Sequence, residues 1–153
     1  MLFVLVVLTA GCATPPGTVT RTLPTDLVEV EVIRTEIDPA AKGQKVILQE
    51  KEGTRSVTIY IGLPEAYAIQ RALDGTTYPR PTTHDLATNL ISALGGQLER
   101  VVIELRENTF IATLVIRQGL FTSQVDARAS DALALALALR TNSPIFVPPA
   151  LLQ

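Results

Sequence analysis

The fold is decided by the stretch Ser130-Asp131-Ala132-Leu133-Ala134-Leu135-Ala136-Leu137-Ala138-Leu139-Arg140. Small and large apolar residues alternate in it with a period of two, which by itself would indicate a strand. Its composition argues the other way, because Ala and Leu are strong helix formers and no β-branched residue interrupts them. Ser130 is a good N-cap, and Asp131 suits the first turn, where the helix dipole favours negative charge. The stretch therefore predicts a helix over residues 130–140 that is buried on nearly all sides.

Strand patterns lie on both sides of this helix, and Gly, Pro and Asn residues separate them. The clearest is Val28-Glu29-Val30-Glu31-Val32, whose alternation of apolar and charged side chains is typical of a half-buried strand. Glu107-Asn108 is expected to form the turn of a hairpin, and Gly119 the next turn. Strands are expected at residues 28–32, 45–50, 56–61, 101–105, 110–117, 121–126 and 144–148.

Two more helices are expected between the third and fourth strands. Pro64 suits the first turn of a helix over residues 65–73, with Glu65 near the positive end of its dipole. Thr82 begins a second helix over residues 82–94. The resulting order is β-β-β-α-α-β-β-β-α-β. Strands joined by hairpins, with helices inserted between them, imply a single α+β domain with three helices on a largely antiparallel or mixed sheet.

The N-terminal residues predict export. Residues 2–8 are a short apolar run that suits the core of a signal peptide and is too short to span a bilayer. The run leads into Leu8-Thr9-Ala10-Gly11-Cys12, which resembles the bacterial lipobox, although Thr9 stands where Leu is usual. A lipid on Cys12 would anchor the protein to a membrane of the bacterial cell envelope. We expect a signal segment at 1–11, a Thr/Pro/Gly-rich tether at 12–26 and the domain at 27–153.

The charge of the chain gives no sign of an extended nucleic-acid surface. Its 153 residues carry a formal net charge of −2, so no strongly basic face is implied. Hydrophobic residues make up 47% of the chain, which is enough for a core and argues against disorder. One Cys and one His are too few for an internal disulfide or a structural zinc site.

The candidate chemistry lies at the three predicted helix starts. Free backbone N–H groups at a helix start can bind a phosphate, and a His there could act as general acid or base. Neighbouring carboxylates could hold a divalent metal ion such as Mg²⁺ or Mn²⁺. Together these are the groups that a phosphodiester hydrolase needs. The candidates are Glu65 at the first start, Arg80, His84 and Asp85 at the second, and Asp126, Arg128 and Asp131 at the third.

Each candidate also has a purely structural interpretation. Asp85 follows Thr82 by three residues, which is close to a capping box. A single His is more often a satisfied structural residue than a catalytic one. Asp126 and Arg128 could pair with each other, and Asp131 is an ordinary residue for a first helical turn. From these residues alone the sequence predicts an α+β domain without a stated activity.

The order of several motifs resembles the bifunctional nuclease family. The central motif of that family is similar to Arg80-Pro81-Thr82-Thr83-His84-Asp85-Leu86 in this chain. Its strand-to-helix motif is similar to Ile59-Tyr60-Ile61-Gly62 followed by Glu65-Ala66-Tyr67-Ala68-Ile69. Its closing block is similar to Asp126-Ala127-Arg128-Ala129-Ser130-Asp131-Ala132, except that Ala129 stands where the family usually has Pro.

The resemblance implies a nuclease that acts on RNA and DNA, and it favours a homo-oligomer. By this resemblance the acidic candidates would be metal ligands or the base, and His84 would be the acid or base. Arg80 and Arg128 would bind phosphate. The acidic residues meant here are Glu65, Asp85, Asp126 and Asp131.

A second interpretation is non-enzymatic. The same polar residues could serve an envelope-anchored module that binds a ligand or promotes assembly. Three features favour this interpretation: the acidic net charge, the lack of a metal-binding motif, and the very apolar stretch at 130–140, which could lie in a dimer core.

Overall fold

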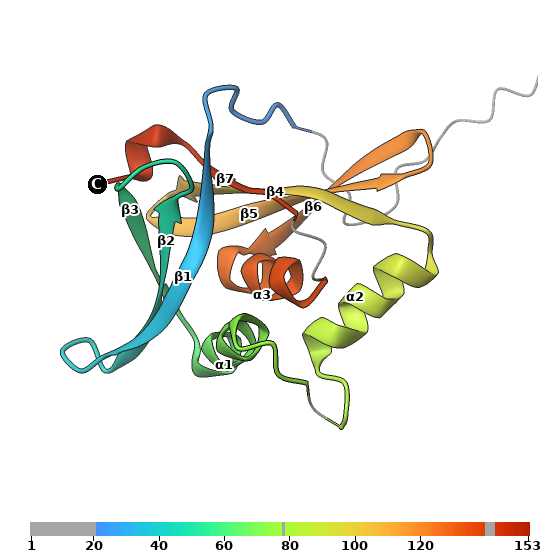
Figure 1. The fold of residues 1–153 in the computed structure, drawn as a ribbon. Coiled ribbons are helices and arrows are strands. Elements are labelled where there is room, and N and C mark those ends of the chain that lie inside the picture. Colours follow the sequence, from blue (N-terminus) through green and yellow to red (C-terminus); the bar gives the residue numbers. More distant parts are fainter. Residues whose placement is uncertain (1–20, 78, 140–142) are drawn as a thin grey trace, which may run out of the picture.

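The computed structural model describes residues 21–77, 79–139 and 143–153, and its elements follow the predicted order (Figure 1). Cys12, the expected signal segment and Arg140 lie outside the described residues. The elements are β1 (Val28–Asp38), β2 (Gly43–Glu50), β3 (Ser56–Ile61), α1 (Leu63–Leu73), α2 (Thr83–Ala93), β4 (Gln97–Arg106), β5 (Thr109–Gln118), β6 (Phe121–Arg128), α3 (Ala129–Leu139), β7 (Ile145–Val147) and a 3-10 helix, η1 (Pro149–Leu151).

The strands form one seven-stranded sheet in the order β3-β2-β1-β7-β4-β5-β6. Two antiparallel three-stranded units, β1–β3 and β4–β6, are joined through the short strand β7. β7 pairs antiparallel with β1 and parallel with β4, where Val101 lies opposite Ile145. The sheet is therefore mixed, and the α+β prediction is confirmed.

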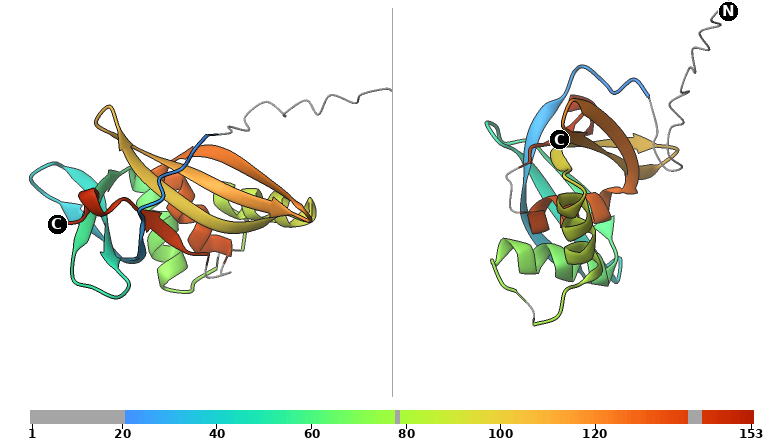
Figure 2. Two further views of the ribbon diagram at one scale, coloured as in Figure 1. Left: turned by 90° about the horizontal axis from the view of Figure 1, so that it is seen from above. Right: turned by 90° about the vertical axis from the view of Figure 1, so that its right-hand side faces the viewer.

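The three helices lie together on one side of the strongly twisted sheet (Figures 1 and 2). Helix α3 is central, because it packs against α1 and α2 as well as against β4, β5 and β6. Ala132 and Leu133 are completely buried, whereas Leu137 and Leu139 are only partly buried. The prediction of a helix buried nearly all round is confirmed for its first two turns. The Leu side chains can point to different neighbours because α3 has sheet on one side and helices on the other.

One detail of the prediction for α3 was wrong. Strand β6 ends at Arg128 and the helix begins at Ala129, so Ser130 lies inside the first turn rather than at the N-cap. The chain passes from strand to helix without a loop, and the position before the helix is therefore a strand residue. Ala129, which stands where the family usually has Pro, is buried.

The other local signals behave as predicted. Thr82 is the N-cap of α2 and forms a complete capping box with Asp85. Pro64 lies in the first turn of α1, although that helix begins at Leu63 rather than at Glu65. Glu107 and Asn108 both have positive φ, 47° and 60°, as a tight two-residue hairpin turn between β4 and β5 requires.

The segment before β1 lies against the sheet where the structure describes it. Arg21 donates hydrogen bonds to Thr113 on β5 and to Asp126 on β6, and it forms an ion pair with Asp126. These contacts attach residues predicted to be the end of the tether to the side of β5 and β6. Among the described helices, none is long and apolar enough to cross a membrane.

Candidate functional site

Three junctions of the fold converge on one group of polar side chains. Glu65 lies in the first turn of α1, His84 in the first turn of α2, Arg128 at the end of β6, and Asp131 in the first turn of α3. We call these four residues the polar cluster. All four are among the candidates at the predicted helix starts, and the structure brings them into contact.

Arg128 is the centre of the polar cluster. Its Nη2 lies 2.6 Å from Glu65 Oε1, and its Nε lies 2.7 Å from Asp131 Oδ2. Nη2 also donates to Asp131 Oδ1 at 3.2 Å. No described residue accepts a hydrogen bond from its third nitrogen, Nη1, and the Arg128 side chain is 68% exposed. Arg128 therefore joins α1 to α3 and keeps donor groups that face solvent.

His84 joins the polar cluster through Asp131. Its Nε2 lies 3.4 Å from Asp131 Oδ1, although the two residues are 47 positions apart in the chain. The His84 side chain is 17% exposed, so the ring is largely enclosed but still reaches solvent. A proton on Nε2 would be donated to the carboxylate and would leave the lone pair of Nδ1 available, because a neutral imidazole carries one proton.

The carboxylate of Asp131 is held in its charged form. Burial raises the pKa of Asp131, but the hydrogen bonds from Arg128 and His84 outweigh that effect, so its pKa lies below the usual range. An ionised Asp131 can orient the His84 ring by accepting a hydrogen bond from it. This is the arrangement of a general acid or base with its orienting group.

Gly62 makes room for Glu65. It is the N-cap residue of α1, and a Cβ on it would overlap with Glu65 Oε2. The Glu65 side chain therefore folds back over Gly62 and reaches Arg128 with little solvent exposure. Because glycine has no side chain, position 62 leaves the space in which the Glu65 carboxylate of the polar cluster lies.

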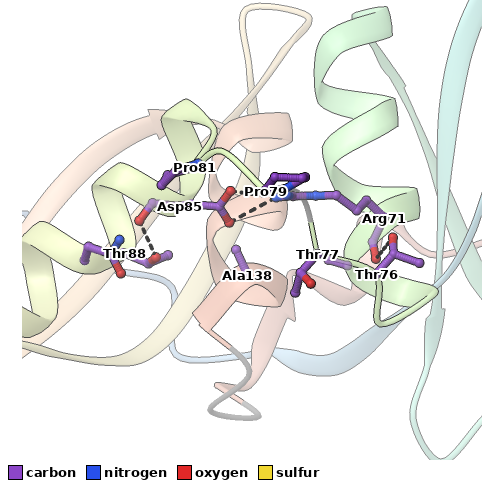
Figure 3. A pocket seen from close by; sticks show the side chains of 10 residues that line it. Arg71, Thr76, Thr77, Pro79, Pro81, Asp85, Thr88 and Ala138 are labelled. Carbon is purple, nitrogen blue, oxygen red and sulfur yellow. Dashed lines mark hydrogen bonds and ion pairs between the residues drawn. The ribbon is translucent and has the colours of Figure 1, made fainter.

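Asp85, the neighbour of His84, lies in a different group. Arg71 Nη2 lies 3.0 Å from Asp85 Oδ1, and the backbone N–H of Thr82 donates to Asp85 Oδ2 at 2.8 Å. The Thr82 hydroxyl also donates to Asp85 Oδ2, at 2.7 Å. We call Arg71, Thr82 and Asp85 the helix clamp, because they connect the end of α1 to the start of α2. Arg71 and Asp85 line a cavity of about 300 Å³. Figure 3 shows their side chains facing each other.

The contacts of Asp85 match the capping interpretation. Burial raises the pKa of Asp85, but the Thr82 backbone and hydroxyl groups and Arg71 together lower it further, so the net pKa is below the usual range. All of these partners are structural parts of the two helices. Sequence reasoning missed Arg71, because an arginine in the last turn of a helix is typical of an exposed residue that complements the dipole.

Two further candidates lie apart from the polar cluster. Asp126 pairs with Arg21, so the suggested pair of Asp126 with Arg128 was wrong; Arg128 is instead occupied by Glu65 and Asp131. Arg80 is exposed in the segment before α2, and no described residue forms an ion pair with it. Neither residue contacts His84 through any described hydrogen bond.

The described residues do not form a preformed metal centre. In residues 21–77, 79–139 and 143–153, no group of three or more His, Cys, Asp or Glu is arranged to hold a metal ion. Within the polar cluster, the cation Arg128 already contacts both Glu65 and Asp131. The expectation that adjacent carboxylates hold Mg²⁺ or Mn²⁺ therefore does not fit the contacts of these side chains.

The chain is similar to proteins of one family. A model of the bifunctional nuclease domain matches residues 46–153, a range that includes all four residues of the polar cluster. Two uncharacterized proteins of Mycobacterium tuberculosis, MT1877 from strain CDC 1551 / Oshkosh and Rv1829 from strain ATCC 25618 / H37Rv, are each 39% identical to it over 125 residues. The aligned region covers 81% of this chain and 73% of each relative.

Proposed function

This chain belongs to the bifunctional nuclease domain family, and on that basis we propose that it cleaves phosphodiester bonds of nucleic acids at the polar cluster. The observation that carries the proposal is the contact of His84 with Asp131, next to the exposed guanidinium of Arg128. An oriented imidazole and an arginine with free donors are the two groups needed for proton transfer and for binding a phosphate.

Each residue of the polar cluster has a role in this proposal. Asp131 orients the His84 ring, whose Nδ1 either takes a proton from the attacking water or donates one to the leaving oxygen, as the new P–O bond to water replaces the bond to the leaving group. Nη1 of Arg128 donates hydrogen bonds to the non-bridging phosphate oxygens and offsets the charge that develops on them. Glu65 also holds the guanidinium in place, through its 2.6 Å contact with Nη2.

The proposal is tested with the purified protein, single-stranded RNA and single-stranded DNA, in Mg²⁺, Mn²⁺ and EDTA. We expect His84→Ala to lower turnover by about a hundredfold or more, as removal of a general acid or base does, with little change in melting temperature. Asp85→Asn is the matched control from the next position of the same helix. It should lower the melting temperature and leave turnover per folded molecule near wild type. Full activity in His84→Ala would contradict the proposal.

A non-enzymatic binding module is the second candidate. The observation that favours it is the pairing of Arg128 with both Glu65 and Asp131, which occupies the carboxylates that could otherwise act as bases or ligands. In that case the wild type would bind nucleic acid or another anion without cleaving it. The absence of cleavage in all conditions of the same assay would favour the binding module.

We further propose that the protein is attached to the cell envelope through a lipid on Cys12. The support is the sequence motif alone, since Cys12 lies outside the described residues. Mass spectrometry of the protein from its native source should show a chain that begins at a lipid-modified Cys12, and Cys12→Ser should release it from membranes. An unmodified chain that retains residues 1–11 would contradict this part of the proposal.

We also propose that the protein forms a homo-oligomer through the outer face of α2. Leu86, Leu90 and Leu94 are exposed one helical turn apart, whereas α3, which was suggested for a dimer core, is buried inside its own domain. Light scattering after size exclusion should show that Leu90→Glu lowers the mass of the particle. Leu120→Glu, at an exposed leucine in the β5–β6 turn, is the control.

A further inference from the structure

A groove of about 620 Å³ adjoins the polar cluster at Arg128. One wall comes from β2 and β3, and the other from the turn between β4 and β5. The beginning of α3 closes one end with Arg128, Ala129 and Ser130. Volumes of this size are typical of sites for small organic ligands.

The wall from β2 and β3 presents an amide group. Gln44 lies opposite Ile61 in the strand pairing, and Ile61 packs against the core, so Gln44 is on the same face of the sheet. Gln44 lines the groove and is partly buried, and no described residue forms a hydrogen bond with its side chain. A half-buried amide without a partner is available for hydrogen bonds to a ligand.

The opposite wall presents an aromatic ring and a second amide. Phe110 packs with one side against the core and lines the groove while remaining partly exposed. Asn108 is in the tight turn, where its φ of 60° fixes the backbone. The side-chain amide of Asn108 likewise has no hydrogen-bond partner among the described residues.

The α3 end of the groove is suited to an anion. Arg128 lines this end, and its Nη1 donates to no described residue; Ser130 lies in the first turn of the helix, where backbone N–H groups are free to bind an anion. Ser130 is only 8% exposed, and its hydroxyl has no hydrogen-bond partner in the described part of the chain. The unpartnered hydroxyl of a serine that is otherwise nearly buried, lining the groove, is a second, independent sign that a ligand binds at this end.

We propose that this groove binds one unpaired nucleotide of the substrate. The base lies against Phe110 with its edge hydrogen-bonded to Gln44 and Asn108, and the adjoining phosphate is bound by Arg128 and Ser130. This inference rests on the proposed function, since it identifies where the nucleotide next to the reacting phosphate is held. A base in a duplex is stacked and paired, so the groove selects single strands.

The test is binding rather than cleavage. Fluorescence anisotropy is measured with a labelled single strand of 2′-O-methyl RNA and with the same strand in which the bases are replaced by abasic sites. We expect Phe110→Leu, which keeps apolar volume and removes the aromatic face, to weaken binding of the base-bearing strand about tenfold. Gln44→Leu should weaken it about fivefold. Neither change should alter binding of the abasic strand.

Three more variants complete the design. Ser130→Ala should weaken binding of both strands equally, because the phosphate is present in both. Gln49→Leu is the matched control on the same strand, since Gln49 donates to Gly53 and does not line the groove. Asn108→Gly removes the second amide and keeps the positive φ that the turn requires.

The outcomes separate this inference from the proposed function. If the wild type binds the base-bearing strand no more tightly than the abasic strand, or if Phe110→Leu and Gln44→Leu weaken both equally, the groove does not bind a base. If base-dependent binding is found but the wild type cleaves no substrate, the groove inference holds and the nuclease proposal fails.

Discussion

The helix clamp and the polar cluster are built from the same chemistry, an arginine shared with carboxylates at helix starts, but they differ in burial. Arg71 of the helix clamp is 8% exposed, and Arg128 of the polar cluster is 68% exposed. A buried ion pair that loses one partner leaves an uncompensated charge, whereas an exposed pair contributes little to stability. Exposure therefore assigns the first group to holding the fold and leaves the second available to bind a ligand.

His84 and Asp85 show how closely the two groups adjoin. They are consecutive residues in the first turn of α2, yet His84 contacts Asp131 and Asp85 contacts Arg71. Consecutive helical residues point in different directions, so one helix start can contribute to two separate clusters. Adjacent polar residues in a motif therefore need not share a role.

The largest predicted effect is on the helix clamp. Arg71→Met should lower the free energy of unfolding by about 3–5 kcal/mol, because Asp85 would lose its cation in a mostly enclosed site. Urea denaturation followed by circular dichroism measures this change. The matched variant Arg128→Met should cost less, because the Arg128 and Asp131 side chains are 68% and 36% exposed and only Glu65, at 11%, would lose its cation in an enclosed site. Equal losses would show that the contrast in burial does not separate the two groups.

The next effect is on activity. Arg128→Lys keeps the positive charge but loses the planar fork that contacts Glu65, Asp131 and a phosphate together, so kcat/KM should fall about tenfold or more. The melting temperature should change little. Arg117→Lys, at an exposed arginine that pairs with Glu99 away from the polar cluster, is the control. A normal kcat/KM in Arg128→Lys would mean that Arg128 does not act as a fork on the substrate.

A smaller effect is expected at Gly62. Gly62→Ala would push the Glu65 carboxylate away from Arg128 and leave it partly desolvated, which should cost about 1 kcal/mol of stability. In the Glu65→Ala background, Gly62→Ala should cause no further loss of stability, because the two residues act through one contact. An additive loss in the double variant would show that Gly62 is needed for another reason.

The smallest effect is on acid stability. The pKa values of Asp85 and Asp131 both lie below the usual range, so the unfolded state binds more protons than the folded state in the intervening pH range. The stability that these groups contribute is present above the unfolded pKa and is lost as pH falls through the folded pKa. Urea midpoints between about pH 5 and pH 2 should therefore drop with acid.

The two aspartates should differ in that experiment. Asp85 is held by the Thr82 backbone, the Thr82 hydroxyl and buried Arg71, whereas the main cation beside Asp131 is exposed. Asp85→Asn should flatten the acid dependence more than Asp131→Asn does. If Asp131→Asn flattened the acid dependence more than Asp85→Asn, the more tightly held carboxylate would lie in the polar cluster. Burial of the arginine would then not predict which of the two groups stabilises the fold.

Much of the fold could be predicted because its signals are local. The sheet order could not, because β7 lies between β1 and β4 and makes the only parallel pair among the described strands. Three residues of strand carry no pattern that selects these neighbours. Their position depends on burial of Ile145 and Val147 between two units that are distant in the chain.

The candidate site was predictable as a set of residues and not as an arrangement. Helix starts and the single His drew attention to all four members of the polar cluster. The same reasoning also named Asp85 and Asp126, which pair with Arg71 and Arg21. Capping and charge patterns identify the polar side chains near a helix end, but they do not predict which cation pairs with each of them.

By itself, the sequence determined the features whose free energy is local: the helix formed by the Ala/Leu repeat of α3, the capping box of Thr82 and Asp85, and the turn at Glu107 and Asn108. Only the tertiary structure decided that His84 meets Asp131 and that Arg71 is buried while Arg128 is open. The physical reason is that propensity, capping and turn geometry act between near neighbours in the chain. Burial and ion pairing depend on the packing of α1, α2 and α3 against one sheet, which brings distant residues together.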